Sequence, residues 1–88
     1  MIEREVTIVN PLGLHARPAA QIVRVASGFA ADVWLCKDGE EVNGKSIMGV
    51  MMLAAECGCT LRIKANGSDE ADAVEALAAL VADGFGEA

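Results

Sequence analysis

The 88-residue sequence has little positive charge and few aromatic side chains. Seven Lys and Arg residues stand against 13 Asp and Glu residues, which gives a formal net charge of −6, and aromatic residues make up 3% of the chain. A sheet that binds RNA needs stacking aromatics and a basic surface, and a negative net charge repels phosphate backbones and anionic lipids. We therefore expect neither a nucleic acid nor a membrane surface as a partner.

Long apolar runs are also missing. Hydrophobic residues make up 53% of the chain, but no run approaches the roughly 18 to 20 apolar residues that span a bilayer. The first five residues lack the basic flank and the apolar stretch of a secretory signal peptide. The length is that of one domain, so we expect residues 1–88 to form a single domain in the cytoplasm, without membrane insertion.

Cysteines are few, and their spacing suits neither a disulfide framework nor a metal site. Cys36, Cys57 and Cys59 are odd in number, and the C-x-C spacing differs from the C-x-x-C of redox proteins and from paired zinc ligands. A metal-carrying domain of ferredoxin-like topology would need C-x-x-C in its first loop, where this chain has His15 alone. We expect small buried or half-buried thiols, no metal site and no cofactor.

The sequence does contain clear periodic segments. Apolar residues alternate with polar ones in four segments and recur at helical spacing in three, and Asp38-Gly39 is typical of a tight hairpin turn. The expected order is strand 3–9, helix 16–27, strand 31–37, strand 40–42, helix 47–55, strand 60–65 and a last helix that Ser68 caps and Gly84 ends. This order predicts an α+β fold, one sheet with all helices packed on a single face.

His15 is the only histidine, and it lies at the predicted N-cap of helix 16–27. Free N–H groups at a helix start bind anions, and an imidazole is largely neutral and nucleophilic near neutral pH. His15 is therefore a candidate acceptor of a phosphoryl group, whose oxygens Arg17 would hold with charge-assisted hydrogen bonds. From the residues alone, a lone histidine at a helix start is more often a surface residue or a cap.

The second candidate segment is 43–55, which has no polar face. A short helix buries one stripe, expected at Ile47, Val50, Leu53 and Ala54, so some of Met48, Met51 and Met52 must face solvent or a partner. Exposed methionines suit surfaces that repack against several partners, whereas buried ones would fill an irregular edge of the core. Ser46 is the predicted N-cap of this helix, a position that also favours an added phosphate.

Two motifs together resemble those of the HPr family, the histidine-containing phosphocarrier proteins of the bacterial phosphoenolpyruvate-dependent sugar phosphotransferase system. They are Gly13-Leu14-His15-Ala16-Arg17-Pro18-Ala19 and Gly44-Lys45-Ser46-Ile47-Met48-Gly49-Val50-Met51. The resemblance covers essentially the whole chain and implies an open-faced β-sandwich, a four-stranded antiparallel sheet with three helices on one side. It implies a carrier and not an enzyme: His15 takes the phosphoryl group on Nδ1 from phosphorylated enzyme I and passes it to EIIA domains, while Arg17 helps to hold it.

The resemblance also implies regulation and a docking surface. Ser46 corresponds to the serine that HPr kinase/phosphorylase modifies in many members, and the expected partner-binding residues are Arg24, Lys45, Ile47, Met48 and Met51. This chain has Ser27 and Gly49 where members often carry lysines, which weakens the expected steering toward enzyme I. We expect a monomer. The alternative is a regulatory HPr-like protein that acts mainly through Ser46 and protein binding, and the presence of His15 argues against it.

Overall fold

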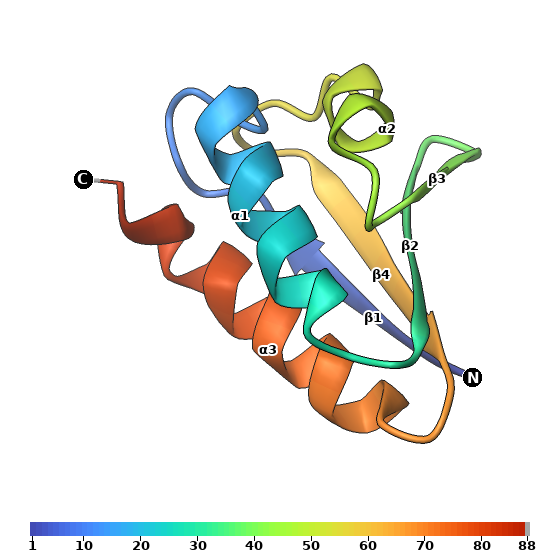
Figure 1. Ribbon diagram of the computed structural model, residues 1–88. Coiled ribbons are helices and arrows are strands. Elements are labelled where there is room, and N and C mark those ends of the chain that lie inside the picture. Colours follow the sequence, from blue (N-terminus) through green and yellow to red (C-terminus); the bar gives the residue numbers. More distant parts are fainter. Residues whose placement is uncertain (88) are drawn as a thin grey trace.

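The computed structural model describes residues 1–87, and it shows a four-stranded antiparallel sheet with three helices packed on one face (Figure 1). This confirms the predicted α+β open-faced sandwich. The strands follow one another across the sheet in the order β1, β4, β2, β3. The elements are β1 (Ile2–Thr7), α1 (Ala16–Ser27), β2 (Asp32–Lys37), β3 (Glu40–Asn43), α2 (Ile47–Met52), β4 (Thr60–Asn66), α3 (Glu70–Ala82) and a terminal 3₁₀ turn, η1 (Gly84–Gly86).

The two central strands, β2 and β4, alternate between buried and more exposed side chains, as the sequence pattern predicts. In the central strand β4, Leu61, Ile63 and Ala65 are buried, because successive side chains of a strand point to opposite faces. Antiparallel pairing places Val6 opposite Leu61 on one side of β4 and Leu35 opposite Ile63 on the other. One face of the sheet is therefore apolar and is covered by the helices.

The helices cover that face with a single hydrophobic core. Figure 1 shows α1 and α3 side by side across the sheet, with α2 beside the start of α1. The core residues on α1 and α3 recur at helical spacing, and four of the nine are alanine; they are Pro18, Ala19, Ile22, Ala26, Ala73, Val74, Leu77, Ala78 and Val81. None of the helices formed by residues 1–87 is both long enough and apolar enough to span a membrane.

Three expectations about local structure are wrong in detail. The first strand ends at Thr7 and not at Val9. Helix α2 ends at Met52 and not at residue 55, because Ala54 has a left-handed backbone (φ 50°). Less than two turns of helix bury only one narrow stripe, so Val50 and Leu53 are buried while Ile47 and Ala54 of the expected stripe are exposed.

The start of α3 is held by Asp69 and not by Ser68. The Asp69 carboxylate accepts hydrogen bonds from the backbone N–H groups of Ala30 (2.9 Å) and Ala31 (2.8 Å), in the loop between α1 and β2. These two donors hold the pKa of Asp69 below its usual range. The carboxylate therefore joins the loop after α1 to the N-terminal end of α3, a tertiary role that the helix-start pattern does not reveal.

This contact predicts the response of stability to acid. A carboxylate whose pKa is lower in the folded state stabilises the fold above its unfolded pKa, near 4, and that contribution is lost as the pH falls through the folded pKa. Asp69→Asn should therefore lower the free energy of unfolding at pH 7 and flatten its decline between about pH 5 and pH 2. Denaturant titrations across this range test the prediction, with Asp72→Asn on the same helix as the matched control. Parallel pH profiles for wild type and Asp69→Asn would contradict it.

Candidate functional site

The loop before α1 is hydrogen-bonded to the segment that follows α2. Leu14 donates its backbone N–H to the Ala55 carbonyl at 2.9 Å. Gly13 has a left-handed backbone (φ 66°), and a Cβ at this position would press against the same carbonyl. Only glycine meets both requirements at this position. The end of α2 is therefore held next to the start of α1 (Figure 1).

His15 is the N-cap residue of α1, as predicted. Its backbone is extended, and its carbonyl accepts the N–H of Ala19 at 3.0 Å. The imidazole makes no capping hydrogen bond to the helix, and 35% of the side chain is exposed. The ring is therefore available at the helix start and is not used to cap it.

The His15 ring is instead held by Glu87. Nε2 lies 2.7 Å from Oε2 of Glu87, whose side chain is 16% exposed. Oε1 of the same carboxylate accepts a hydrogen bond from Asn10 at 2.9 Å. The Asn10 hydrogen bond, together with the contact to His15 and the nearby charge of Arg17, lowers the pKa of Glu87. An ionised carboxylate only accepts hydrogen bonds, so Nε2 carries the proton and, in a neutral ring, Nδ1 carries the lone pair.

Arg17 lies near this pair, and Arg24 lies further along the same helix. Both are exposed residues of α1, and both line a groove together with Glu87. The Arg17 guanidinium is close enough to the Glu87 carboxylate to contribute to its lowered pKa. The structure thus brings His15, Arg17 and Glu87 together, while Arg24 lies in the last turn of α1.

Ser46 and Lys45 lie at the start of α2, and both are half-buried. Ser46 is the N-cap, as predicted, and its Oγ accepts the N–H of Gly49 at 3.2 Å. Lys45 donates from Nζ to the Phe29 carbonyl at 2.9 Å, so its ammonium group connects α2 to the end of α1. Lys45 is thus tied to this carbonyl and is not a freely exposed cation.

Helix α2 presents an exposed apolar surface next to the start of α1. Its residues Ile47, Met48, Met51 and Met52 have exposed fractions between 41% and 72%. We call these four residues the methionine surface. The prediction that methionines of this segment face away from the core is confirmed. Exposed apolar residues that cluster in this way are typical of sites that contact other molecules.

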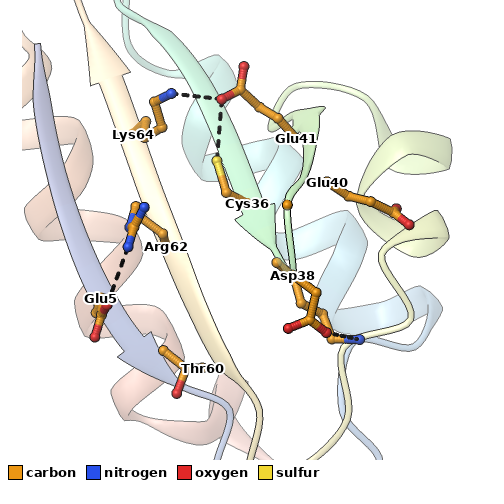
Figure 2. A pocket seen from close by; sticks show the side chains of 10 residues that line it. Glu5, Cys36, Asp38, Glu40, Glu41, Thr60, Arg62 and Lys64 are labelled. Atoms are coloured by element: carbon orange, nitrogen blue, oxygen red, sulfur yellow. Dashed lines mark hydrogen bonds and ion pairs between the residues drawn. The ribbon is translucent and has the colours of Figure 1, made fainter.

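A second group of charged residues lies on the open face of the sheet, and it is internally paired (Figure 2). Lys64 contacts Glu41 at 2.7 Å, and Arg62 contacts Glu5 at 3.5 Å. Burial, followed by the hydrogen bond to Glu41, raises the pKa of the Cys36 thiol, which keeps it protonated and weakly nucleophilic. This hollow therefore offers neither an unpaired charge cluster nor an activated thiol.

The remaining two cysteines differ in exposure. Cys59 is half-buried like Cys36, but Cys57 is exposed, so the expectation for Cys57 is wrong. The Cys57 Sγ atom lies 3.7 Å from the Val9 carbonyl oxygen. Among residues 1–87, no three His, Cys, Asp or Glu side chains gather closely enough to hold a metal ion.

Glu87 and Asn10 are the site residues that sequence reasoning missed. Asn10 looks like an ordinary turn residue before Pro11. The terminal Phe85-Gly86-Glu87 is part of the family resemblance, but no role at the site was predicted for Glu87. They are 77 positions apart, and Glu87 is 72 positions from His15. No local pattern reports a contact over such a separation.

Comparisons with known proteins agree with the fold and the motifs. Residues 2–83 match the family model described as "PTS HPr component phosphorylation site". The phosphocarrier protein HPr of Cupriavidus necator is 48% identical over 87 residues, which are 99% of this chain and 98% of that protein. The crystal structure of HPr-C-His from Thermoanaerobacter tengcongensis has a TM-score of 0.96 at 45% identity and covers 100% of this chain and 99% of that one.

A further similar structure is that of Crh, a catabolite repression protein of Bacillus subtilis, which is described as a dimer with a swapped domain. It has a TM-score of 0.77 at 47% identity and covers 94% of this chain and 95% of that one. The similar proteins thus include phosphocarriers as well as a catabolite repression protein, and at least one of them is dimeric.

Proposed function

The chain belongs to the HPr family of phosphocarrier proteins of the bacterial phosphotransferase system, and from this premise we propose that it carries a phosphoryl group on His15. The observation that supports the proposal is the position of the ring. The imidazole lies partly exposed at the N-cap of α1, and its Nε2 already contacts Glu87. Nδ1 is then the nitrogen that accepts the group.

The transfer step needs no cofactor. The Nδ1 lone pair attacks the phosphorus of a phosphohistidine on phosphorylated enzyme I, a bond forms between Nδ1 and phosphorus, and the donor's own nitrogen–phosphorus bond breaks. Nε2 keeps its proton throughout. The reverse sequence at an EIIA domain frees His15 again, so the protein is a carrier that returns to its starting state.

The start of α1 stabilises the transferred group. Intrahelical hydrogen bonds begin with the Ala19 N–H, and Pro18 has no N–H to satisfy, so the N–H groups of Ala16 and Arg17 lie at the positive end of the helix dipole. The Arg17 guanidinium adds charge-assisted hydrogen bonds to phosphate oxygens. These groups stabilise a dianionic phosphoryl group beside His15, even though the net charge of the protein is −6.

The methionine surface is the proposed docking site for enzyme I and the EIIA domains. It lies beside the start of α1, where His15 is exposed, and flexible methionines suit more than one partner. Arg17 and Arg24 of α1 are the proposed cationic contacts to these partners, whereas Lys45 contributes less than its sequence position predicts, because its ammonium contacts the Phe29 carbonyl. We place the protein in the cytoplasm as a single domain and as a monomer. Sedimentation at increasing concentration tests the oligomeric state, and a stable dimer would contradict it.

Ser46 is the proposed site of regulation, by HPr kinase/phosphorylase where that enzyme is present. The similarity to Crh, a catabolite repression protein of Bacillus subtilis, supports a regulatory role for this protein. A phosphate at the N-cap of α2 adds about two negative charges beside the docking site. It does not destabilise the helix, because negative charge is favourable at a helix N-terminus. The alternative is a chain that acts only through Ser46. Phosphoryl labelling by enzyme I distinguishes this alternative from the carrier function.

The direct test of the carrier function is labelling by phosphoenolpyruvate in the presence of enzyme I. His15→Ala should lose the acid-labile label while its circular dichroism stays that of the wild type, because the ring is partly exposed and the helix does not need it as a cap. Ser46→Ala is the matched control and should label normally. Undiminished labelling of His15→Ala would place the phosphoryl group elsewhere, and absence of labelling in the wild type would favour the regulatory alternative.

Met48→Glu tests the methionine surface. Because Met48 is 69% exposed, the change should alter the free energy of unfolding by no more than about 0.5 kcal/mol. It should raise the apparent KM for enzyme I by roughly fivefold, the effect of one useful interface residue. Ala71→Glu adds the same charge at the far end of the molecule and should leave KM unchanged. Equal KM values for Met48→Glu and wild type would move the docking site off α2.

Ser46→Asp tests regulation by charge. It should slow phosphoryl transfer to His15 on the order of fivefold at low ionic strength, mostly through weaker association, and the deficit should shrink as salt screens the repulsion. Ser46→Asn, which has the same shape without the charge, should transfer faster than Ser46→Asp under the same conditions. A deficit that salt does not change would rule out electrostatic regulation.

A further inference from the structure

We propose that Cys57 and Cys59 form a reversible thiol–disulfide site, and that its oxidation loosens the loop that leads into His15. The two cysteines lie in the segment between α2 and β4, on either side of Gly58. Both are free; Cys57 is exposed and Cys59 is half-buried. An accessible thiol next to a second, resolving thiol is typical of cysteines that oxidants modify reversibly.

The backbone at the two cysteines forms a tight turn followed by a β-bulge. The Cys59 N–H donates to the Glu56 carbonyl at 3.0 Å, which closes a turn over residues 56–59. Gly58 has a left-handed backbone (φ 91°) and donates to the Ile8 carbonyl at 2.7 Å. The Ile8 N–H in turn donates to the Cys59 carbonyl at 2.9 Å. Two residues thus oppose the buried Ile8, as in a bulge with glycine at its first position, and this core residue fixes the backbone that carries both thiols.

The spacing of the cysteines allows their sulfur atoms to meet. Positions two apart in a chain have Cα atoms separated by at most about 7 Å, and a turn shortens this distance into the range of about 4.4 to 6.8 Å that is found in disulfides. The Cys57 Sγ atom lies 3.7 Å from the Val9 carbonyl oxygen. The Cys59 Sγ atom accepts the Glu56 N–H at 3.3 Å. Thiols are weak hydrogen-bonding groups, so only weak contacts are exchanged for the sulfur–sulfur bond.

A small-molecule disulfide such as oxidised glutathione is the proposed oxidant. The Cys57 thiolate attacks one of its sulfur atoms, the glutathione disulfide bond breaks, and one glutathione leaves from the resulting mixed disulfide. The Cys59 thiolate then attacks the Cys57 sulfur and releases the second glutathione. The two electrons from the protein thiols reduce the glutathione disulfide, and their two protons are taken up by the glutathione thiolates.

A disulfide between these two cysteines suits reversible modification better than a structural role. It closes a very short loop, and short loops gain less stability from a disulfide than long ones do. Its ring is tighter than that of a C-x-x-C disulfide, and strained, exposed disulfides are easily reduced. In a reducing compartment such bonds form only transiently, under oxidising conditions.

The turn is also connected to the loop before α1. The Ala55 carbonyl accepts the Leu14 N–H at 2.9 Å. The next residue, Glu56, donates its own N–H to the Cys59 sulfur. A bond to Cys57 turns that sulfur away and removes this hydrogen bond from the segment that holds Leu14. Oxidation is therefore expected to weaken the contact that positions the start of α1.

Thiol counting after oxidation tests the site. The full chain is incubated with excess oxidised glutathione at pH 8, because the thiolate is the reacting form, and is then denatured, alkylated and weighed by mass spectrometry. The wild type should lose two hydrogens and keep one alkylated thiol, on Cys36. Dithiothreitol should restore all 3 thiols of the chain. Cys36→Ser is the matched control and should form the same disulfide.

Single substitutions in the turn separate the two roles. In Cys59→Ser the reaction should stop at the mixed disulfide, with glutathione bound to Cys57. Cys57→Ser should take up glutathione more slowly, because Cys59 is half-buried. The proposal would be overturned by a fully alkylated wild type, by a disulfide that includes Cys36, or by a wild-type product that keeps glutathione on Cys57.

Amide hydrogen exchange tests the connection to the loop before α1. In the oxidised protein the Leu14 N–H should exchange about fivefold faster than in the reduced protein, the effect of one lost hydrogen bond. The amide of Leu77 in α3 should exchange at the same rate in both states. Equal Leu14 rates in the two states would overturn the connection. Neither measurement uses phosphoryl transfer, so both are decided independently of the proposed carrier function.

Discussion

The Nδ2 group of Asn10 donates one hydrogen bond to the Gly13 carbonyl and another to Glu87, and through them it joins the loop before α1 to the turn after α3. The placement of His15 depends on this junction, because His15 follows that loop and contacts that carboxylate. The Oδ1 atom of Asn10 is buried and has no partner among residues 1–87. A buried amide with an unsatisfied oxygen costs stability, so we ascribe the role of Asn10 to the geometry that it imposes on the site and not to a contribution to folding.

The fold places two kinds of surface side by side. Helices α1 and α3 lie across the sheet on stripes rich in alanine, and the bond from Leu14 to Ala55 holds the end of α2 beside the start of α1. The proposed phosphoryl acceptor at a helix start and an exposed apolar helix thereby share one end of the molecule. A carrier needs this proximity, because each partner must dock and reach the same nitrogen in turn.

Much of this architecture is readable from the sequence, and the failures have physical causes. Period-two alternation identified the strands, and the helical spacing from Ala16 to Ser27 gave the bounds of α1. His15 and Ser46 at the N-caps followed from local chemistry. The roles of Asp69, Lys45 and Glu87 could not be predicted, because each side chain contacts backbone or side-chain atoms that are distant in sequence and meet it only when the chain has folded.

The central claim is that Glu87 occupies Nε2 and leaves Nδ1 of His15 as the phosphoryl acceptor. Long-range proton–nitrogen correlation NMR on protein labelled with nitrogen-15 histidine and phosphorylated by enzyme I tests it most directly, because it identifies which ring nitrogen is bonded to phosphorus. The account predicts phosphorus on Nδ1 and a retained proton on Nε2. Phosphorus on Nε2 would require the contact with Glu87 to break and would contradict the account.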